Sequence, residues 1–185
     1  LQFTTEGLPQ SAYRKISTNV CIDRQCRRLE ITLFWDITGR YLGFELPPGE
    51  FLSKSEHKPF TDAEYKQLHT LLSDPYSPLA GYSLEQLVPS VKGKTGEVDA
   101  VTSATVKEVL TDVGEGAVYT SYTMWHIVHG NTKNEVQKLG LRYFSEELAM
   151  LILDSANSVG QICMLNILAE KKEWNEKLLK NVLSL

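Results

Sequence analysis

One stretch of the chain alternates strictly between apolar and polar residues, and it limits the possible folds more than any other part of the sequence. Apolar residues occur at every second position from Leu29 to Trp35, and Glu30 and Thr32 lie between them. Successive side chains of a β-strand point to opposite faces, so this spacing predicts a strand with one buried face.

A turn and a second alternating run follow directly. Residues 36–39 read Asp-Ile-Thr-Gly, and Gly39 can adopt the positive φ that a tight turn needs. Alternation resumes from Arg40 to Leu46 and stops at Pro47, which has no N–H to donate to a strand partner. We therefore expect an antiparallel hairpin over residues 29–46.

Helical signals fill much of the remaining chain. Thr61 and Glu64 have the spacing of a capping box, and so do Ser83 and Gln86. Residues 119–129 carry aromatic and apolar side chains at helical spacing, and Ser145 opens a series of apolar helices that continues to the end of the chain.

These patterns predict an α+β fold. A small antiparallel sheet with covering helices is expected over residues 1–118, followed by a mainly helical segment over residues 119–185 that packs on it. Residues 1–20 show no sustained period and are expected to form an irregular lead-in.

Charge and hydropathy exclude two classes of partner. The 185 residues contain 19 Lys and Arg against 23 Asp and Glu, a formal net charge of -4, so no general basic field exists to hold nucleic acid. The longest apolar stretches, such as residues 149–153, are far shorter than the roughly 20 residues of a membrane-spanning helix. We expect neither nucleic-acid binding nor a membrane span in this chain.

The three cysteines leave two interpretations open. Cys21 and Cys26 are separated by four residues before the first predicted strand, whereas Cys163 lies in an apolar helical pattern. One local disulfide with one buried thiol, or three free thiols, would both fit this spacing. A disulfide would indicate an oxidising compartment, and hence an extracytoplasmic, periplasmic or exported protein.

Residues 97–106 are the best candidate for a ligand-binding segment. Three hydroxyl residues precede an apparent helix, and the N–H groups of a helix N-terminus suit a phosphate. However, Thr105 and Glu108 also have capping-box spacing, which would explain Thr105 without a ligand.

The run Asp99, Ala100, Val101, Thr102, Ser103, Ala104 and Thr105 resembles the flavinylation motif of FMN-binding domains, as in the FMN-carrying subunits of sodium-translocating NADH:quinone reductase. The resemblance covers roughly residues 25–125. It implies that a flavin transferase joins Thr105 to the FMN phosphate, that Asp99 is the leading acid, and that Thr102, Ser103 and Ala104 complete the loop.

Two positions depart from that motif. Ser103 stands where the family has glycine, and Lys107 stands where it usually has serine or threonine. Glycine would allow a close backbone approach, so these departures favour a relative that has lost the flavin.

Aromatic residues after the motif also have two interpretations. Tyr119, Tyr122, Trp125 and His126 could stack on an isoalloxazine ring, or they could be the core face of a helix. His126 and His129 share a helix face and could offer two imidazoles to a metal, but no further residues have metal-ligand spacing.

The leading hypothesis is a flavin-binding electron-transfer module that uses FMN, held by Asp99, Thr102, Ser103, Ala104 and Thr105 with Tyr119 and His126. Such a protein would be an electron carrier with a redox partner protein, and no residue is assigned a catalytic role. The alternative is a flavin-free binding module that uses the Tyr/Trp-rich segment and the C-terminal helices as a partner surface. A metal-dependent enzyme is a third possibility.

Overall fold

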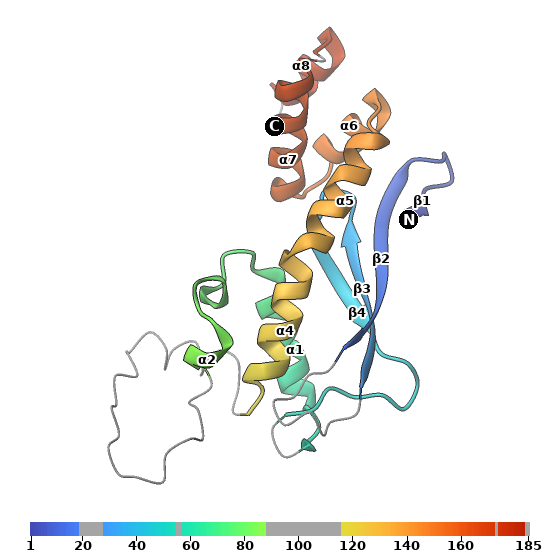
Figure 1. The fold of residues 1–185 in the computed structure, drawn as a ribbon. Helices are drawn as coiled ribbons and strands as arrows, with labels where there is room; N and C mark the ends of the chain where they lie inside the picture. Colours follow the sequence, from blue (N-terminus) through green and yellow to red (C-terminus); the bar gives the residue numbers. More distant parts are fainter. Residues whose placement is uncertain (19–27, 55–56, 88–115, 173, 184–185) are drawn as a thin grey trace. The chain divides into compact units, whose positions relative to one another are not determined.

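A computed structural model describes residues 1–18, 28–54, 57–87, 116–172 and 174–183 (Figure 1). The fold is α+β, as the sequence predicts: a four-stranded antiparallel sheet is followed by helices. The strands lie in the order β1-β2-β3-β4, so neighbours in the sheet are neighbours in the sequence. They are β1 (Gln2–Phe3), β2 (Pro9–Thr18), β3 (Leu29–Asp36) and β4 (Tyr41–Glu45).

The predicted hairpin is confirmed as β3 and β4. Leu29, Ile31, Leu33 and Trp35 are all buried, with at most 3% of each exposed, so the alternating face of β3 lies in the core. Backbone bonds close the turn, because Asp36 N donates to Arg40 O at 2.9 Å and Gly39 N donates to Asp36 O at 2.9 Å. Gly39 has φ of 86°, the left-handed conformation that glycine adopts without strain.

The expected irregular lead-in is wrong, because residues 1–18 contain β1 and the ten-residue strand β2. Ser11 and Ala12 are both buried while the next three residues are exposed, so β2 lacks a clean period of two. The strand is instead stabilised by pairing with its neighbours and by contacts with residues distant in sequence. Arg14 Nη1 donates to Thr132 Oγ1 at 2.8 Å, which is one such contact.

The first helices begin where the capping boxes predict. Thr61 Oγ1 accepts from Glu64 N at 3.4 Å, and Thr61 N donates to Glu64 Oε2 at 2.7 Å. Ser83 N donates to Gln86 Oε1 at 2.7 Å ahead of the next short helix. The elements are α1 (Asp62–Ser73), the 3-10 helix η2 (Pro78–Gly81), α2 (Leu84–Leu87) and α4 (Val118–His129).

The C-terminal third is helical, as predicted, and includes one helix that the sequence analysis did not identify. That helix, α5 (Asn131–Arg142), follows α4 after Gly130 and buries only Thr132, Val136 and Gly140. Its inner face is small and partly polar, so it lacks the apolar stripe that marks a helix in sequence. The last helices are α6 (Glu146–Leu153), α7 (Ser158–Lys171) and α8 (Glu176–Val182).

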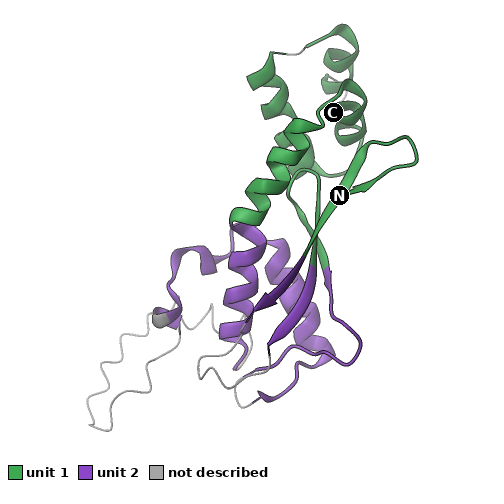
Figure 2. Ribbon diagram, turned by 45° about the vertical axis from the view of Figure 1, so that its right-hand side comes forward, with its two compact units in different colours: residues 1–14, 33–43, 131–185 green, residues 15–32, 44–130 purple. Residues whose placement is uncertain are grey.

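The described chain divides into two compact units (Figure 2). Unit 1 comprises residues 1–14, 33–43 and 131–185, and unit 2 comprises residues 15–32 and 44–130. Both units take residues from β2, β3 and β4. The predicted division between residues 118 and 119 stays a prediction.

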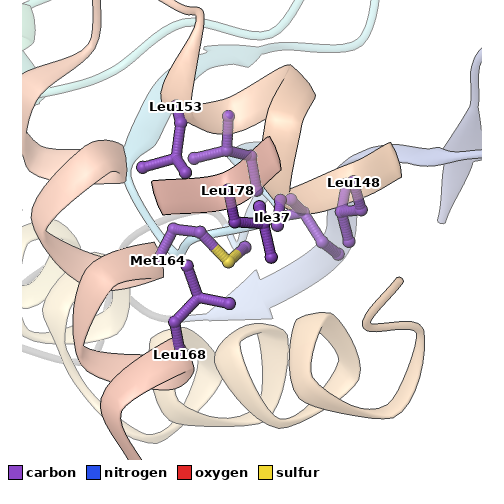
Figure 3. Packing of buried hydrophobic residues seen from close by; sticks show 8 residues of the cluster. Ile37, Leu148, Leu153, Met164, Leu168 and Leu178 are labelled. Atoms are coloured by element: carbon purple, nitrogen blue, oxygen red, sulfur yellow. The ribbon is translucent and has the colours of Figure 1, made fainter. Parts of the chain in front are cut away.

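The core of unit 1 joins the hairpin turn to the C-terminal helices. Ile37 packs with Leu148, Leu153, Met164 and Leu168, all of which are at most 5% exposed (Figure 3). Helix α6 contacts both α7 and α8. An apolar residue of the turn therefore fills part of a helical core, which explains why the turn contains isoleucine.

Unit 2 has its own packing, centred on α1 and α4. These two helices contact each other, and α4 also contacts η2 and α2. Helix α1 packs against β4 through rings: Phe44 is stacked on His69, with centroids 4.6 Å apart and planes at 11°. The hydroxyl of Tyr65 accepts from Leu52 N at 2.8 Å.

Candidate functional site

Five of the predicted site residues lie outside the described part of the chain, and so do the two cysteines for which a disulfide or free thiols were both left open. Those site residues are Asp99, Thr102, Ser103, Ala104 and Thr105. The cysteines are Cys21 and Cys26. The two remaining site residues, Tyr119 and His126, belong to α4 in unit 2 and can be examined directly.

Tyr119 and His126 lie on one side of α4. They are seven residues apart, which is close to two helical turns, and both are half-buried. Tyr122 lies between them on the same side, and its ring centroid is 4.2 Å from that of His126. The predicted helix therefore aligns these three side chains.

Trp125 belongs to the core rather than to an open platform. Only 5% of Trp125 is exposed, and Met124 and Val128 beside it are also buried. Its ring meets His126 edge-on, with centroids 5.0 Å apart and planes at 82°, and lies 4.6 Å from the ring of His129. For Trp125, the interpretation as the core face of a helix is therefore correct.

Two ring nitrogens of α4 bind the C-terminal end of α1. Trp125 Nε1 donates to Asp74 O at 2.9 Å, and His129 Nε2 lies 2.9 Å from Leu72 O. A carbonyl oxygen only accepts, so His129 carries a proton on Nε2. The last carbonyls of a helix have no partner within the helix, and these side chains supply one.

Unlike Trp125 Nε1 and His129 Nε2, the Nε2 atom of His126 does not bind a carbonyl oxygen in the described part of the chain. Its Nε2 is buried and has no hydrogen-bond partner among the described residues, and the same is true of Ser121 Oγ on the same helix. A buried polar atom without a partner costs about 1–3 kcal/mol, so such atoms call for an explanation. A ligand with a hydrogen-bonding edge would satisfy Nε2, and the isoalloxazine ring of a flavin has such an edge. A buried water would satisfy the same atom.

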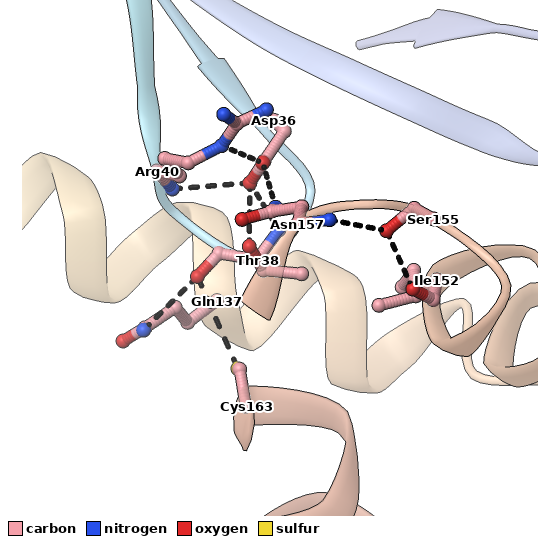
Figure 4. Close-up of polar contacts among 8 residues, drawn as sticks. All are labelled: Asp36, Thr38, Arg40, Gln137, Ile152, Ser155, Asn157 and Cys163. Atoms are coloured by element: carbon pink, nitrogen blue, oxygen red, sulfur yellow. Dashed lines mark hydrogen bonds and ion pairs between the residues drawn. The ribbon is translucent and has the colours of Figure 1, made fainter. Parts of the chain in front are cut away.

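A second polar cluster, in unit 1, surrounds Asp36 (Figure 4). Asp36 Oδ1 accepts from Thr38 N, Thr38 Oγ1 and Arg40 N at 2.9, 2.6 and 3.0 Å. Its Oδ2 accepts from Arg40 Nε at 2.9 Å and from Asn157 Nδ2 at 3.1 Å. Five donors occupy the carboxylate, so Asp36 holds the turn in place and has little capacity left to act as a base or a metal ligand.

Cys163, on α7, lies beside this turn. Its Sγ is 4.0 Å from Thr38 O, which also accepts from Gln137 Nε2 at 3.1 Å. Burial raises the pKa of the Cys163 thiol, the negative charge of Asp36 raises it further, and Lys133 partly opposes both. Only the thiolate is a strong nucleophile, so Cys163 is a poorly reactive free thiol.

Most of this cluster has no signal in the sequence. The Asp-Ile-Thr-Gly run is a recognisable turn signal, because an Asp side chain often binds the backbone two residues later. Nothing local in the sequence connects that turn to Gln137, Asn157 or Cys163, which lie about a hundred residues or more further on.

Unit 2 also contains an open cavity of about 540 Å³ at one end of the sheet. Residues from β2, β3 and the end of β4 line it, including Lys15, Glu30, Glu45 and Pro47. The charged members are exposed and of both signs, which is typical of a solvated strand surface.

Within the described ranges, no three His, Cys, Asp or Glu residues are grouped so that they could hold a metal ion. None of the helices described is both long enough and apolar enough to cross a bilayer. No protein-family model, curated protein or solved structure matches this chain.

Proposed function

We propose that this chain is a flavin-binding electron-transfer module that carries FMN. The observation behind the proposal is the run from Asp99 to Thr105, whose residue types and order resemble a flavinylation motif. Thr105 would bear the FMN through a bond between its Oγ and the FMN phosphorus, formed when the hydroxyl loses its proton and displaces the leaving group of an activated flavin phosphate that the transferase binds. The flavin would carry the electrons, while the protein would orient it and adjust its potential.

Helix α4 provides support from the described residues. His126 keeps a buried nitrogen without a partner, next to the rings of Tyr122 and Trp125. An apolar side chain at this position would avoid the cost of burying that nitrogen, so a bound ligand or a buried water is the expected partner.

The proposal includes a location outside the cytoplasm and two protein partners. A disulfide between Cys21 and Cys26 would require an oxidising compartment. A flavin transferase would be needed to load Thr105, and a redox partner protein would exchange electrons with the flavin.

Co-expression of the chain with a flavin transferase tests this function. The expected product is yellow, and its intact mass exceeds that of the unmodified chain by one FMN less one water, with the added mass on the peptide that contains Thr105. A known flavinylation domain, expressed beside it, shows that the transferase is active. Colourless protein of unmodified mass under those conditions would contradict the proposal.

A second candidate is a flavin-free module that binds a partner protein, and the surface of unit 1 favours it. Most of the large apolar side chains that are exposed belong to this unit, and several lie on its last three helices. Those on α6, α7 and α8 are Leu151, Val159, Ile162 and Leu179. Since Trp125 is buried, the C-terminal helices would provide this surface without it.

The exposed apolar surface has its own test. Ile162 is 60% exposed, so Ile162→Asp should leave the melting temperature nearly unchanged. The same change should weaken binding of a purified protein partner of this module. If this protein is colourless and its partner binds Ile162→Asp as tightly as the wild type, the second candidate is wrong.

A further inference from the structure

The hydrogen-bonding groups on α4 are used unequally. Trp125 Nε1 and His129 Nε2 both bind carbonyl oxygens at the end of α1. His126 lies between them in sequence, and its Nε2 is buried without a partner among the residues that the structure describes. His126 Nε2 is therefore a ring nitrogen on α4 to which the described residues give no hydrogen bond.

The ring of His126 is held in a defined orientation. Tyr122 lies one helical turn earlier, with the two ring planes at 49° and the centroids 4.2 Å apart. Trp125 meets the imidazole edge-on, with centroids 5.0 Å apart. Two ring contacts and a helical backbone restrict rotation of the side chain, so Nε2 is preorganised for a directional contact.

We propose that His126 Nε2 forms the hydrogen bond between this chain and the isoalloxazine ring of FMN. The proposal rests on the flavin-binding function above and assigns the contact to one atom. The isoalloxazine edge carries carbonyl oxygens and an N–H group, and a neutral imidazole nitrogen can donate or accept according to its tautomer. His126 is thus a positioning residue for the flavin, held in place by Tyr122 and Trp125.

The elements packed on α4 determine how a ligand reaches this atom. Helices α1 and α2 and the 3-10 helix η2 all contact α4, and Nε2 is closed to solvent. A flavin must therefore displace some of the side chains that cover it. An internal water is the competing explanation, since buried waters commonly bind such polar atoms.

Nitrogen NMR of the wild-type protein tests the contact without a substitution. Protein labelled with ¹⁵N-histidine is titrated with free FMN, and the His126 signals are assigned from the spectrum of His126→Gln. A saturable shift of His126 Nε2, in parallel with quenching of FMN fluorescence, is expected. The exposed His57 serves as the internal reference and should not shift. Binding of FMN with unchanged His126 signals would overturn the proposal and favour the buried water.

Variants supply a second measurement. His126→Phe keeps the ring and removes the nitrogen, and it should weaken FMN binding about tenfold, the size of a lost hydrogen bond. His126→Gln restores a polar atom and should recover part of the affinity. His57→Gln is the matched control and should bind as the wild type does, and circular dichroism checks that each variant is folded. Equal affinity for folded His126→Phe and wild type would contradict the assignment.

The two proposals fail separately. Flavin attached to Thr105 with an unmoved His126 would contradict only the contact proposed here. A shift of His126 on binding free FMN, with no attachment to Thr105, would support the contact and contradict the covalent part of the function. If FMN neither attaches nor binds, both proposals are wrong.

Discussion

Asn157 Nδ2 donates a hydrogen bond of 3.1 Å to Oδ2 of Asp36, a residue 121 positions earlier in the chain. Asn157 is the N-cap residue of α7, but its side chain makes no capping bond to that helix. The amide instead binds the hairpin turn. This contact connects the β3–β4 turn to the C-terminal helices within unit 1.

The bond should make the two residues energetically coupled. Asp36→Ala leaves several donors without their acceptor and should lower the free energy of unfolding by about 2–3 kcal/mol, because hydrogen bonds to charged groups are strong. Asn157→Ala should cost about 1 kcal/mol. Urea unfolding of both variants and of the double variant gives the coupling energy. Strictly additive losses would show that the bond contributes nothing.

Replacing Gly140 by alanine should destabilise the protein, although the same replacement normally stabilises a helix. Alanine is favoured over glycine inside a helix by about 1 kcal/mol. At Gly140, however, an added Cβ would lie 2.7 Å from Ile37 O, a backbone atom of the hairpin turn. We expect Gly140→Ala to destabilise the protein by roughly 1–3 kcal/mol in urea unfolding. Gly81→Ala, where nothing lies within 4 Å of the new atom, is the control, and a more stable Gly140→Ala variant would refute the packing.

The indole N–H of Trp125 should contribute to the packing of α4 on α1. Trp125→Phe keeps an aromatic ring but leaves Asp74 O without this donor, so the free energy of unfolding should fall by about 1–3 kcal/mol. Thermal unfolding by circular dichroism measures the effect. Trp174→Phe is the matched control, since Trp174 is 39% exposed and should change stability by less than about 0.5 kcal/mol. Equal melting temperatures for the two variants would contradict this role.

His69 should make stability depend on pH. Burial lowers the pKa of His69 below its ordinary value of 6.5, so the folded protein binds this proton less readily than the unfolded chain does. The stability that depends on uncharged His69 is fully present above the pKa that His69 has in the unfolded chain. It is lost as the pH falls through the lower pKa that His69 has in the folded protein. Urea unfolding between pH 7.5 and about pH 5 should show this loss. In His69→Phe, which keeps a ring beside Phe44, the slope should be smaller; an unchanged slope would exclude His69 as its source.

Under the proposed function, covalent attachment of the flavin depends on Thr105. Thr105→Ala should abolish any covalent flavin, because alanine has no hydroxyl to bond to phosphorus. The sequence predicts a helix cap at Thr105, and losing such a cap usually lowers the free energy of unfolding by about 1 kcal/mol. Intact mass after co-expression with a transferase measures the first effect, and thermal unfolding measures the second. If this variant still carries covalent flavin, another residue is the acceptor.

Local patterns were sufficient to predict several elements correctly. The hairpin followed from the alternation between Leu29 and Trp35, and α1 followed from the spacing of Thr61 and Glu64. These signals are reliable because strand periodicity and capping bonds involve residues only two or three positions apart. The helix that carries Tyr119 and His126 was predicted for the same reason.

Other elements had no local signal. Strand β2 lacks clean alternation and is ordered by its pairing with neighbours, and α5 buries a face too polar to mark a helix. The orphaned nitrogen of His126 was equally hidden. Sequence places the imidazole on a helix, but only packing shows that Trp125 and His129 bind α1 while His126 binds none of the described residues.

The sequence by itself determined the α+β class, the hairpin and the main helix starts, because each depends on the order of nearby residues. Only the tertiary structure decided that Asp36 binds Asn157, that Ile37 fills a helical core, and that Trp125 points inward. Those contacts join residues far apart in the chain, and their formation depends on how whole elements pack rather than on any spacing that can be read along the sequence.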